Sequence, residues 1–159
     1  MKENNNPIVI KVLDEMDLCN HKDILIKLLL ENYKLNFPDY KNLDRFANAN
    51  YVDMVRFTAD KSAIILGAYE NNQFLGFIWG YRKEFLNEKR IHIDHIVVQS
   101  QSRGKGIGTK LINQLEDIAK KEGIQCIDLV TSLNNENTVQ FYNSKGFSMT
   151  RVQFEKKLG

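Results

Sequence analysis

The stretch from residue 91 to residue 122 constrains the fold more than any other part of the chain. It begins with an apolar run that is typical of a buried strand, Ile91–Val98. A bend with three glycines in five residues follows, at Gly104, Gly106 and Gly108. Apolar residues then recur with the spacing of one helix face, at Ile107, Leu111, Ile112, Leu115, Ile118 and Ala119. The sequence therefore predicts a strand, a glycine-rich turn and a long amphipathic helix.

The glycine-rich turn also predicts a site for an anion. Glycine leaves backbone N–H groups uncovered by a side chain, and a helix N-terminus carries the positive end of the helix dipole. Together these groups suit a phosphate. One glycine would suffice for a tight turn, so three glycines favour a bound phosphate over a purely structural bend.

Two common phosphate loops do not fit this turn. A nucleoside-triphosphatase loop needs Gly-x-x-x-x-Gly-Lys-Ser/Thr, but the residue five positions after Gly104 is Thr109. The dinucleotide fingerprint Gly-x-Gly-x-x-Gly places Thr109 at its third glycine when it starts at Gly104, and Leu111 when it starts at Gly106. A third pattern, Gln/Arg-x-x-Gly-x-Gly/Ala, fits 103–108 throughout.

With this third pattern the chain resembles the GNAT superfamily of acetyl-coenzyme A-dependent N-acetyltransferases. A second block, 134–147, is similar to the family signature Asn-x-x-Ala-x-x-Phe-Tyr-x-x-x-Gly-Phe. Thr138 or Val139 stands at the small-residue position. Asn137 lies closer to Phe141-Tyr142 than the family asparagine does, and Asn134 or Asn135 fits that position as well. The resemblance implies acetyl-coenzyme A (acetyl-CoA) as co-substrate and no metal.

The remaining elements follow in the order that the family has. We expect strands over 7–13, 63–69, 74–81, 91–98, 124–131 and 147–154, and helices over 23–33, 42–57, 107–122 and 136–144. Residues 70–72 turn the second strand into the third as a β-hairpin, and a polar bend over 82–89 leads into the fourth. The order β-α-α-β-β-β-α-β-α-β implies an α/β (α+β) GNAT fold, a mixed, mostly antiparallel sheet of six to seven strands with helices on both faces. We expect a single domain over 1–159.

Composition limits the partners and the compartment. The 22 basic and 20 acidic residues give a net charge of +2, which argues against nucleic acid as a partner. The apolar runs are too short to span a bilayer, and the polar N-terminus predicts no signal peptide and no membrane partner. Cys19 and Cys126 have no metal-ligand spacing and suit a reducing cytosol, so we expect a cytoplasmic protein. The resemblance also allows a homodimer.

The resemblance assigns acetyl-CoA binding to the loop and to the strand before it. Backbone N–H groups of the loop would cradle the pyrophosphate, while the side chains of Arg103 and Lys105 either add charge or stay in solvent. In the family, a bulge in the preceding strand frees N–H groups for the acetyl oxygen and the pantetheine. The residues implied are Ile96, Val97, Val98, Arg103, Gly104, Lys105, Gly106, Ile107, Gly108, Thr109 and Asn137.

Acetyl transfer to an amine also needs an acid for the leaving thiolate and a base for the ammonium. Tyr142 matches the family tyrosine that donates a proton to the coenzyme A thiolate. His92 and Asp94 occupy positions where the family often carries a catalytic residue, histidine having the ordinary pKa of a base near neutrality. Strict strand alternation would place His92 and Asp94 on one face and His95 on the other.

The expected reaction is direct transfer of an acetyl group from acetyl-CoA to a primary amine of a small molecule, in a ternary complex. A protein or peptide N-acetyltransferase, acting on an N-terminus or a lysine, would need an open groove instead of a closed pocket. A non-catalytic acyl-CoA-sensing module would keep the loop but lose the acid and the base. We expect the acceptor to enter between the N-terminal helices and the sheet, where the candidate aromatic residues are Tyr33, Phe37, Tyr40, Phe46, Tyr51 and Trp79.

Overall fold

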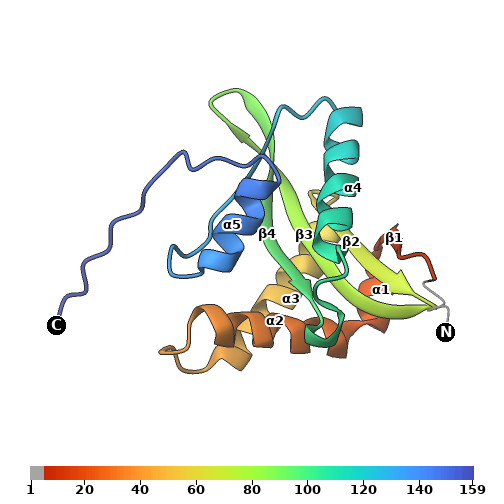
Figure 1. Ribbon diagram of the computed structural model, residues 1–159, viewed down its shortest axis with the longest axis horizontal. Coiled ribbons are helices and arrows are strands. Elements are labelled where there is room, and N and C mark those ends of the chain that lie inside the picture. The colour runs from red at the N-terminus through yellow and green to blue at the C-terminus, as the bar shows by residue number, and fades with distance from the viewer. Residues whose placement is uncertain (1–5) are drawn as a thin grey trace.

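The computed structural model describes residues 6–159, with a five-stranded sheet at its centre (Figure 1). In spatial order the strands are β1 (Val9–Val12), β2 (Ala63–Glu70), β3 (Gln73–Phe85), β4 (Glu88–Val98) and β5 (Cys126–Leu129). All neighbouring strands are antiparallel except β4 and β5, which are parallel. The expected mixed, mostly antiparallel sheet is confirmed.

Helices cover both faces of this sheet, as predicted (Figure 1). On one face, α1 (Glu15–Asn20), α2 (Lys22–Asn36) and α3 (Leu43–Ala59) form an apolar core with β2 and β3. On the other face, α4 (Ile107–Lys121) and α5 (Glu136–Ser144) pack against the opposite side chains of β2, β3 and β4. A short 3₁₀ turn, Ser100–Ser102, connects β4 to the loop before α4.

Two tight hairpins join the central strands. The β2–β3 turn is formed by Asn71 and Asn72, whose φ angles of 51° and 62° are left-handed, a conformation that asparagine tolerates. The β3–β4 turn is formed by Leu86 and Asn87, with φ angles of 50° and 63°. Here the sequence predicted only a polar bend over 82–89, whereas cross-strand pairing continues to Phe85↔Glu88. Polar side chains continue this ladder because the hairpin runs past the edge of the core.

The expected last strand over 147–154 is wrong, and within 6–159 the sheet has five strands instead of six to seven. Phe147 packs against Tyr142 at the end of α5, but the chain beyond it leads away from the sheet (Figure 1). The guanidinium of Arg151 lies 4.3 Å from the centre of the Phe85 ring, at the β3–β4 hairpin. The apolar side chain of Phe154 is 93% exposed, so this segment has no buried face with which to pack as a strand.

The first helix, α1, was not predicted from the sequence. It is short, and Asp14 caps its N-terminus by accepting a hydrogen bond from Asp17 N–H at 2.9 Å. The Asp17 carboxylate accepts in return from Asp14 N–H at 3.1 Å. This reciprocal cap stabilises the helix. Leu18 is its single buried residue, so the sequence has no repeated apolar spacing from which the helix could be predicted.

Candidate active site

A cleft of about 980 Å³ lies between the end of α2, the second half of β4, the start of α4 and α5. Every residue expected to bind acetyl-CoA or to act in catalysis lines it, with the exception of Lys105. The ammonium of Lys105 instead lies 4.0 Å from Glu70 Oε2. The fold therefore gathers residues from three separate parts of the sequence around one cavity.

The N-terminus of α4 faces this cleft through the glycine-rich loop. Gly106 precedes the helix with a φ angle of 74°, which a residue with a side chain adopts only with strain. The first bond within the helix runs from Lys110 N–H to the Gly106 carbonyl at 3.1 Å, so the N–H groups of 107–109 have no partner in the helix. A Cβ atom on Gly108 would lie 3.2 Å from Phe141 Cζ, so the third glycine lets α4 approach α5.

The predicted apolar face of α4 is confirmed. Its buried residues are Ile107, Leu111, Ile112, Leu115 and Ala119. Ile118 packs against the same cluster and is partly buried. This face fixes the helix on the sheet, so the polar N–H groups at its start have a fixed position beside the cleft.

β4 and β5 separate next to this helix N-terminus. Their parallel pairing runs from Arg90↔Cys126 to Ile93↔Leu129 and then stops. β4 continues alone to Val98, paired only with β3. The edge of β4 that faces away from β3 is therefore open over 94–98, and these residues line the cleft.

A β-bulge interrupts β4 at the same place. Trp79 pairs with His95 and Gly80 pairs with Ile93, so Asp94 has no opposite residue on β3. The extra residue reverses the alternation of side chains along the strand. Ile93 belongs to the core on the α4 side, whereas Val97, four residues later, belongs to the core on the α1–α3 side. Without the bulge, two residues four positions apart would lie on the same face.

This reversal corrects the expected position of His95. Strict alternation placed its side chain on the face opposite Asp94, but its Nδ1 lies 2.8 Å from Asp94 Oδ2. The His95 ring also packs edge-on against Tyr33 of α2, with ring centres 5.4 Å apart. His92, Asp94 and His95 all line the cleft.

Asn50 of α3 connects this part of β4 to the core. Its amide nitrogen donates to Asp94 Oδ2 at 3.0 Å, and its amide oxygen accepts from Trp79 Nε1 at 3.2 Å. Burial raises the pKa of the Asp94 carboxyl, but the His95 and Asn50 hydrogen bonds and the charge of His95 outweigh burial and hold the pKa below its usual range. The sequence did not single out Asn50, because a helical asparagine has the same local pattern as the exposed Asn48.

The candidate aromatic residues divide into three groups. Tyr33 and Phe37 line the cleft at the end of α2. Tyr51 and Trp79 are buried in the core under α1–α3 instead. The other two, Tyr40 and Phe46, are exposed outside the cleft.

Tyr142 lies on the other side of the cleft, on α5. Its ring packs between Phe141 and Phe147, with ring centres 5.4 Å and 5.5 Å away, and the residue is 8% exposed. Burial raises the pKa of the Tyr142 phenol to about 12. The phenol therefore holds its proton at neutral pH and is a donor of hydrogen bonds into the cleft.

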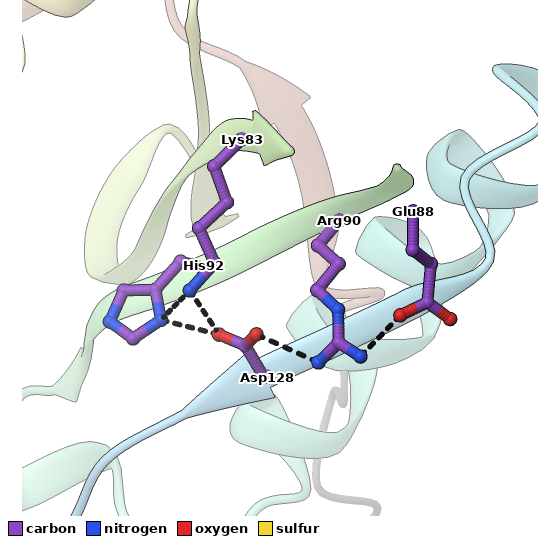
Figure 2. A network of polar contacts seen from close by, with 5 residues as sticks. All are labelled: Lys83, Glu88, Arg90, His92 and Asp128. Atoms are coloured by element: carbon purple, nitrogen blue, oxygen red, sulfur yellow. Dashed lines mark hydrogen bonds and ion pairs between the residues drawn. The ribbon is translucent and has the colours of Figure 1, made fainter. Parts of the chain in front are cut away.

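His92 has a carboxylate partner that the sequence did not reveal. Its Nδ1 lies 2.5 Å from Oδ1 of Asp128 on β5, and both belong to a polar network that bridges β3, β4 and β5 (Figure 2). Asp128 stands opposite His92 in the parallel register of β4 and β5. This register depends on tertiary structure, so the sequence offered no signal for the pair.

One side of the cleft is closed by a contact between α2 and the start of α5. The Asn135 amide nitrogen donates to Asn36 Oδ1 at 3.1 Å, although the two residues are 99 positions apart. Asn135 also caps α5 by accepting from Thr138 N–H at 3.4 Å. Both asparagines line the cleft, so the contact narrows it at the end of α2.

Within 6–159, no group of three or more His, Cys, Asp or Glu side chains is arranged to hold a metal ion. None of the described helices combines the length and the apolar character needed to cross a membrane.

The sequence of this chain is similar to those of known N-acetyltransferases. Over 94 residues the chain is 30% identical to N-alpha-acetyltransferase 50 of Danio rerio, a match that covers 57% of this chain and 56% of that protein. The chain spans only 30% to 57% of the length of three curated relatives, an N-acetyltransferase of Methanocaldococcus jannaschii and two proteins of Bacillus subtilis.

Solved structures share the fold at low sequence identity. The PaiA N-acetyltransferase of Thermoplasma acidophilum in complex with coenzyme A has a TM-score of 0.73 at 22% identity, over 92% of this chain and 93% of that one. An aminoglycoside acetyltransferase from an uncultured soil metagenomic sample has a TM-score of 0.73 at 19% identity, over 99% and 100%. The family model of acetyltransferases (GNAT) matches residues 23–147, well over half of the chain. With the glycine loop, the separated strands and this match together, the chain belongs to the acetyltransferase (GNAT) family.

Proposed function

We propose that this protein is an N-acetyltransferase that moves an acetyl group from acetyl-CoA to the primary amine of a small molecule. The observation that carries the proposal is the single cleft, which holds an anion-binding helix N-terminus at one end and Asp94, His92 and Tyr142 around it. A phosphate group and a reacting amine can therefore occupy one cavity. The coenzyme A complex of the Thermoplasma relative supports the same ligand here.

In this proposal, acetyl-CoA binds along the loop and the open edge of β4. The N–H groups of 104–109 hold the pyrophosphate, and Arg103 and Asn137 lie along the same cleft. The edge of β4 that faces away from β3 is open over Ile96, Val97 and Val98, and its backbone groups supply hydrogen bonds to the thioester carbonyl and the pantetheine. Lys105 lies outside the cleft, so its contribution would be limited to long-range charge.

The transfer then needs three proton movements. Asp94, held as a carboxylate, attracts the acceptor ammonium, and His92 takes the first proton from it. The neutral amine nitrogen attacks the thioester carbon, and the carbon–sulfur bond breaks. Tyr142 gives its proton to the departing thiolate, a step that is uphill for a phenol but feasible in a buried site. The second proton of the amine nitrogen then restores the Tyr142 phenol, and the amide forms.

The acceptor half of the cleft favours a small amine with one positive charge. Asp94 is the one carboxylate among the described residues that line the cleft, so a polycation finds a single counter-charge. The contact between Asn36 and Asn135 closes one side, where a peptide-wide groove would be open. A peptide N-terminus is the second candidate acceptor, favoured by the similarity to N-alpha-acetyltransferase 50.

A panel of amines, with release of the coenzyme A thiol as readout, tests these alternatives. We expect small monoamines to give higher kcat/KM than polyamines, aminoglycosides or short peptides. Asn135→Ala should open the α2–α5 contact and raise the kcat/KM of peptides relative to small amines, with the exposed Asn48→Ala as matched control. Peptides as the best wild-type substrates would overturn the small-molecule assignment. Stabilisation by acetyl-CoA without turnover of any amine would indicate a sensing module.

Three further expectations belong to this proposal. The free cysteines Cys19 and Cys126 support a reducing cytosolic compartment. The family match over 23–147 supports one domain over 1–159. A homodimer is compatible with both and is tested by light scattering at several protein concentrations.

A further inference from the structure

Within residues 6–159, the imidazole of His92 makes both of its polar contacts through one ring nitrogen. Nδ1 lies 2.5 Å from Asp128 Oδ1 and 3.3 Å from Lys83 Nζ. Lys83 Nζ also lies 3.0 Å from the same Asp128 oxygen, so the three groups form a triangle (Figure 2). These contacts leave Nε2 as the ring nitrogen that is available to the cleft, which His92 lines.

No arrangement of hydrogens satisfies all three contacts of the triangle, so the shortest contact, between Nδ1 and Asp128 at 2.5 Å, outweighs the longest, between Nδ1 and Lys83 at 3.3 Å. A neutral ring nitrogen either donates or accepts, a carboxylate only accepts and an ammonium only donates. With hydrogen on Nδ1, both the imidazole and Lys83 donate to Asp128. Without it, the Nδ1 lone pair would face a carboxylate oxygen at 2.5 Å, which is repulsive.

Asp128 remains a carboxylate because donors surround it. Arg90 Nη1 lies 3.3 Å from its Oδ2, and Arg90 is itself paired with Glu88 (Figure 2). Burial raises the pKa of the Asp128 carboxyl, but the hydrogen bonds from His92, Lys83 and Arg90 outweigh burial and hold it below the usual range. Asp128 therefore accepts hydrogen bonds throughout the neutral pH range.

We propose that Asp128 is a positioning residue that fixes His92 in the tautomer with hydrogen on Nδ1, which leaves the Nε2 lone pair to take a proton from the acceptor ammonium. The proposal rests on the proposed function, in which His92 is the base. In the other tautomer Nε2 carries a hydrogen and cannot accept one. Asp128 acts only through the imidazole, because it lies outside the residues that line the cleft.

The charged and titratable groups that face His92 come from three strands. Asp128 lies on β5, and Lys83 lies on β3. Tyr81 of β3 packs its ring 5.4 Å from the imidazole, and the charge of His92 acts on Asp94 of the same strand. Of these groups, only Asp128 and Lys83 touch Nδ1, so they alone compete for the tautomer.

Nitrogen NMR of histidine-labelled protein reads the tautomer directly. The chain has three histidines, His21, His92 and His95, so single substitutions assign the signals. In the wild type we expect His92 with a protonated Nδ1 and a bare Nε2. In Asp128→Asn the carboxamide can donate to Nδ1, so the Nε2–H tautomer should dominate. The matched control Lys83→Met removes the competing donor and should keep the wild-type tautomer.

A kinetic cycle tests whether the tautomer matters for transfer. Asp128→Asn should lower kcat by about 10- to 1000-fold with little change in KM, as loss of a positioned base does. In a His92→Gln background the same change should have no further effect, because the two residues act as one unit. Stabilisation by acetyl-CoA checks that each variant is folded.

The outcomes separate this proposal from the proposed function. An Nε2–H tautomer in the wild type, an unchanged tautomer in Asp128→Asn, or an additive loss in the double variant overturns the role of Asp128. Wild-type turnover in His92→Gln, with the expected tautomer present, overturns His92 as the base instead. If Asp128→Asn does not fold, the spectra of the wild type and of Lys83→Met still decide the tautomer.

Discussion

Replacing Asn50 with alanine removes three hydrogen bonds at once: one to the core, one to Asp94 and a longer one, at 3.4 Å, to the Tyr33 hydroxyl. The first two are the stronger contacts. The indole N–H of Trp79 loses its acceptor at 3.2 Å, and the Asp94 carboxylate loses a donor at 3.0 Å. Trp79 is 1% exposed, so water cannot replace the lost acceptor without a rearrangement of the core. Asp94 keeps its contact with His95 and is only partly buried, so losing the Asn50 donor costs less free energy at Asp94 than at Trp79.

The expected loss of unfolding free energy follows from these two contacts. An unpaired buried donor costs about 1–3 kcal/mol, and the weakened contact to Asp94 adds about 1 kcal/mol. Alanine recovers about 0.5 kcal/mol through its higher helix propensity. The net loss is about 1.5–3.5 kcal/mol, which corresponds to a fall in Tm of about 3–14 °C for a chain of this length.

Urea unfolding measures this loss, and the single tryptophan of the chain makes the site its own probe. Trp79 fluorescence and far-UV circular dichroism should give one transition for the wild type and for the variant. Asn48→Ala is the matched control, because the exposed Asn48 side chain bonds only to a backbone carbonyl of the same helix, that of Asp44, at 2.8 Å. We expect its effect to stay within about 0.5 kcal/mol.

A further variant separates hydrogen bonding from charge. Asn50→Asp keeps the shape of the side chain but places a second carboxylate beside Asp94 Oδ2. Its loss of stability should be larger at pH 7 than at pH 4, where the two groups share a proton. Equal stability losses for Asn50→Ala and Asn48→Ala would refute the reasoning that Asn50 links the core to the site.

Four further predictions test the site. Acetyl-CoA at 100 times its Kd should stabilise the protein by about 2.7 kcal/mol. Gly106→Glu should abolish this stabilisation, whereas Gly106→Asn should retain it because asparagine tolerates the left-handed backbone. Stabilisation retained in both variants would contradict the loop assignment. Tyr142→Phe should fold, bind acetyl-CoA and lose about ten- to a thousandfold in kcat, and unchanged kcat would leave Tyr142 as a packing residue. Asp94→Asn should mainly raise KM for the amine, while His92→Gln should remove one limb of the pH–rate profile. The pKa of Asp94 is lower in the folded state than in the unfolded state, so its carboxylate stabilises the fold above the unfolded pKa and loses this effect as the pH falls through the folded pKa. Asp94→Asn should therefore weaken the fall in unfolding free energy at acid pH. An identical fall in the wild type and the variant would disprove this contribution.

Local sequence was sufficient for the parts of the site that depend on nearest neighbours. The glycine loop and the apolar face of α4 follow from residues within one turn of each other, and both lie where the spacing predicted. The hairpin at Asn71-Asn72 and the helix over Glu136–Ser144 follow in the same way. The physical reason is that backbone conformation and periodic burial are properties of a short segment.

Tertiary structure decided how the polar residues meet. One extra residue at Asp94 reverses the alternation of β4 and moves His95 to the face that the sequence excluded. Asn50 reaches Asp94 across 44 positions, and Asp128 reaches His92 across 36, through contacts that exist only once strand register and helix packing are set. The missing strand after α5 has the same cause, because a segment with strand-forming residues becomes a strand only where the edge of a sheet is within reach. The sequence by itself determined which segments form the loop and its helix, whereas the folded chain alone determined which carboxylate faces which imidazole, because that pairing depends on long-range register.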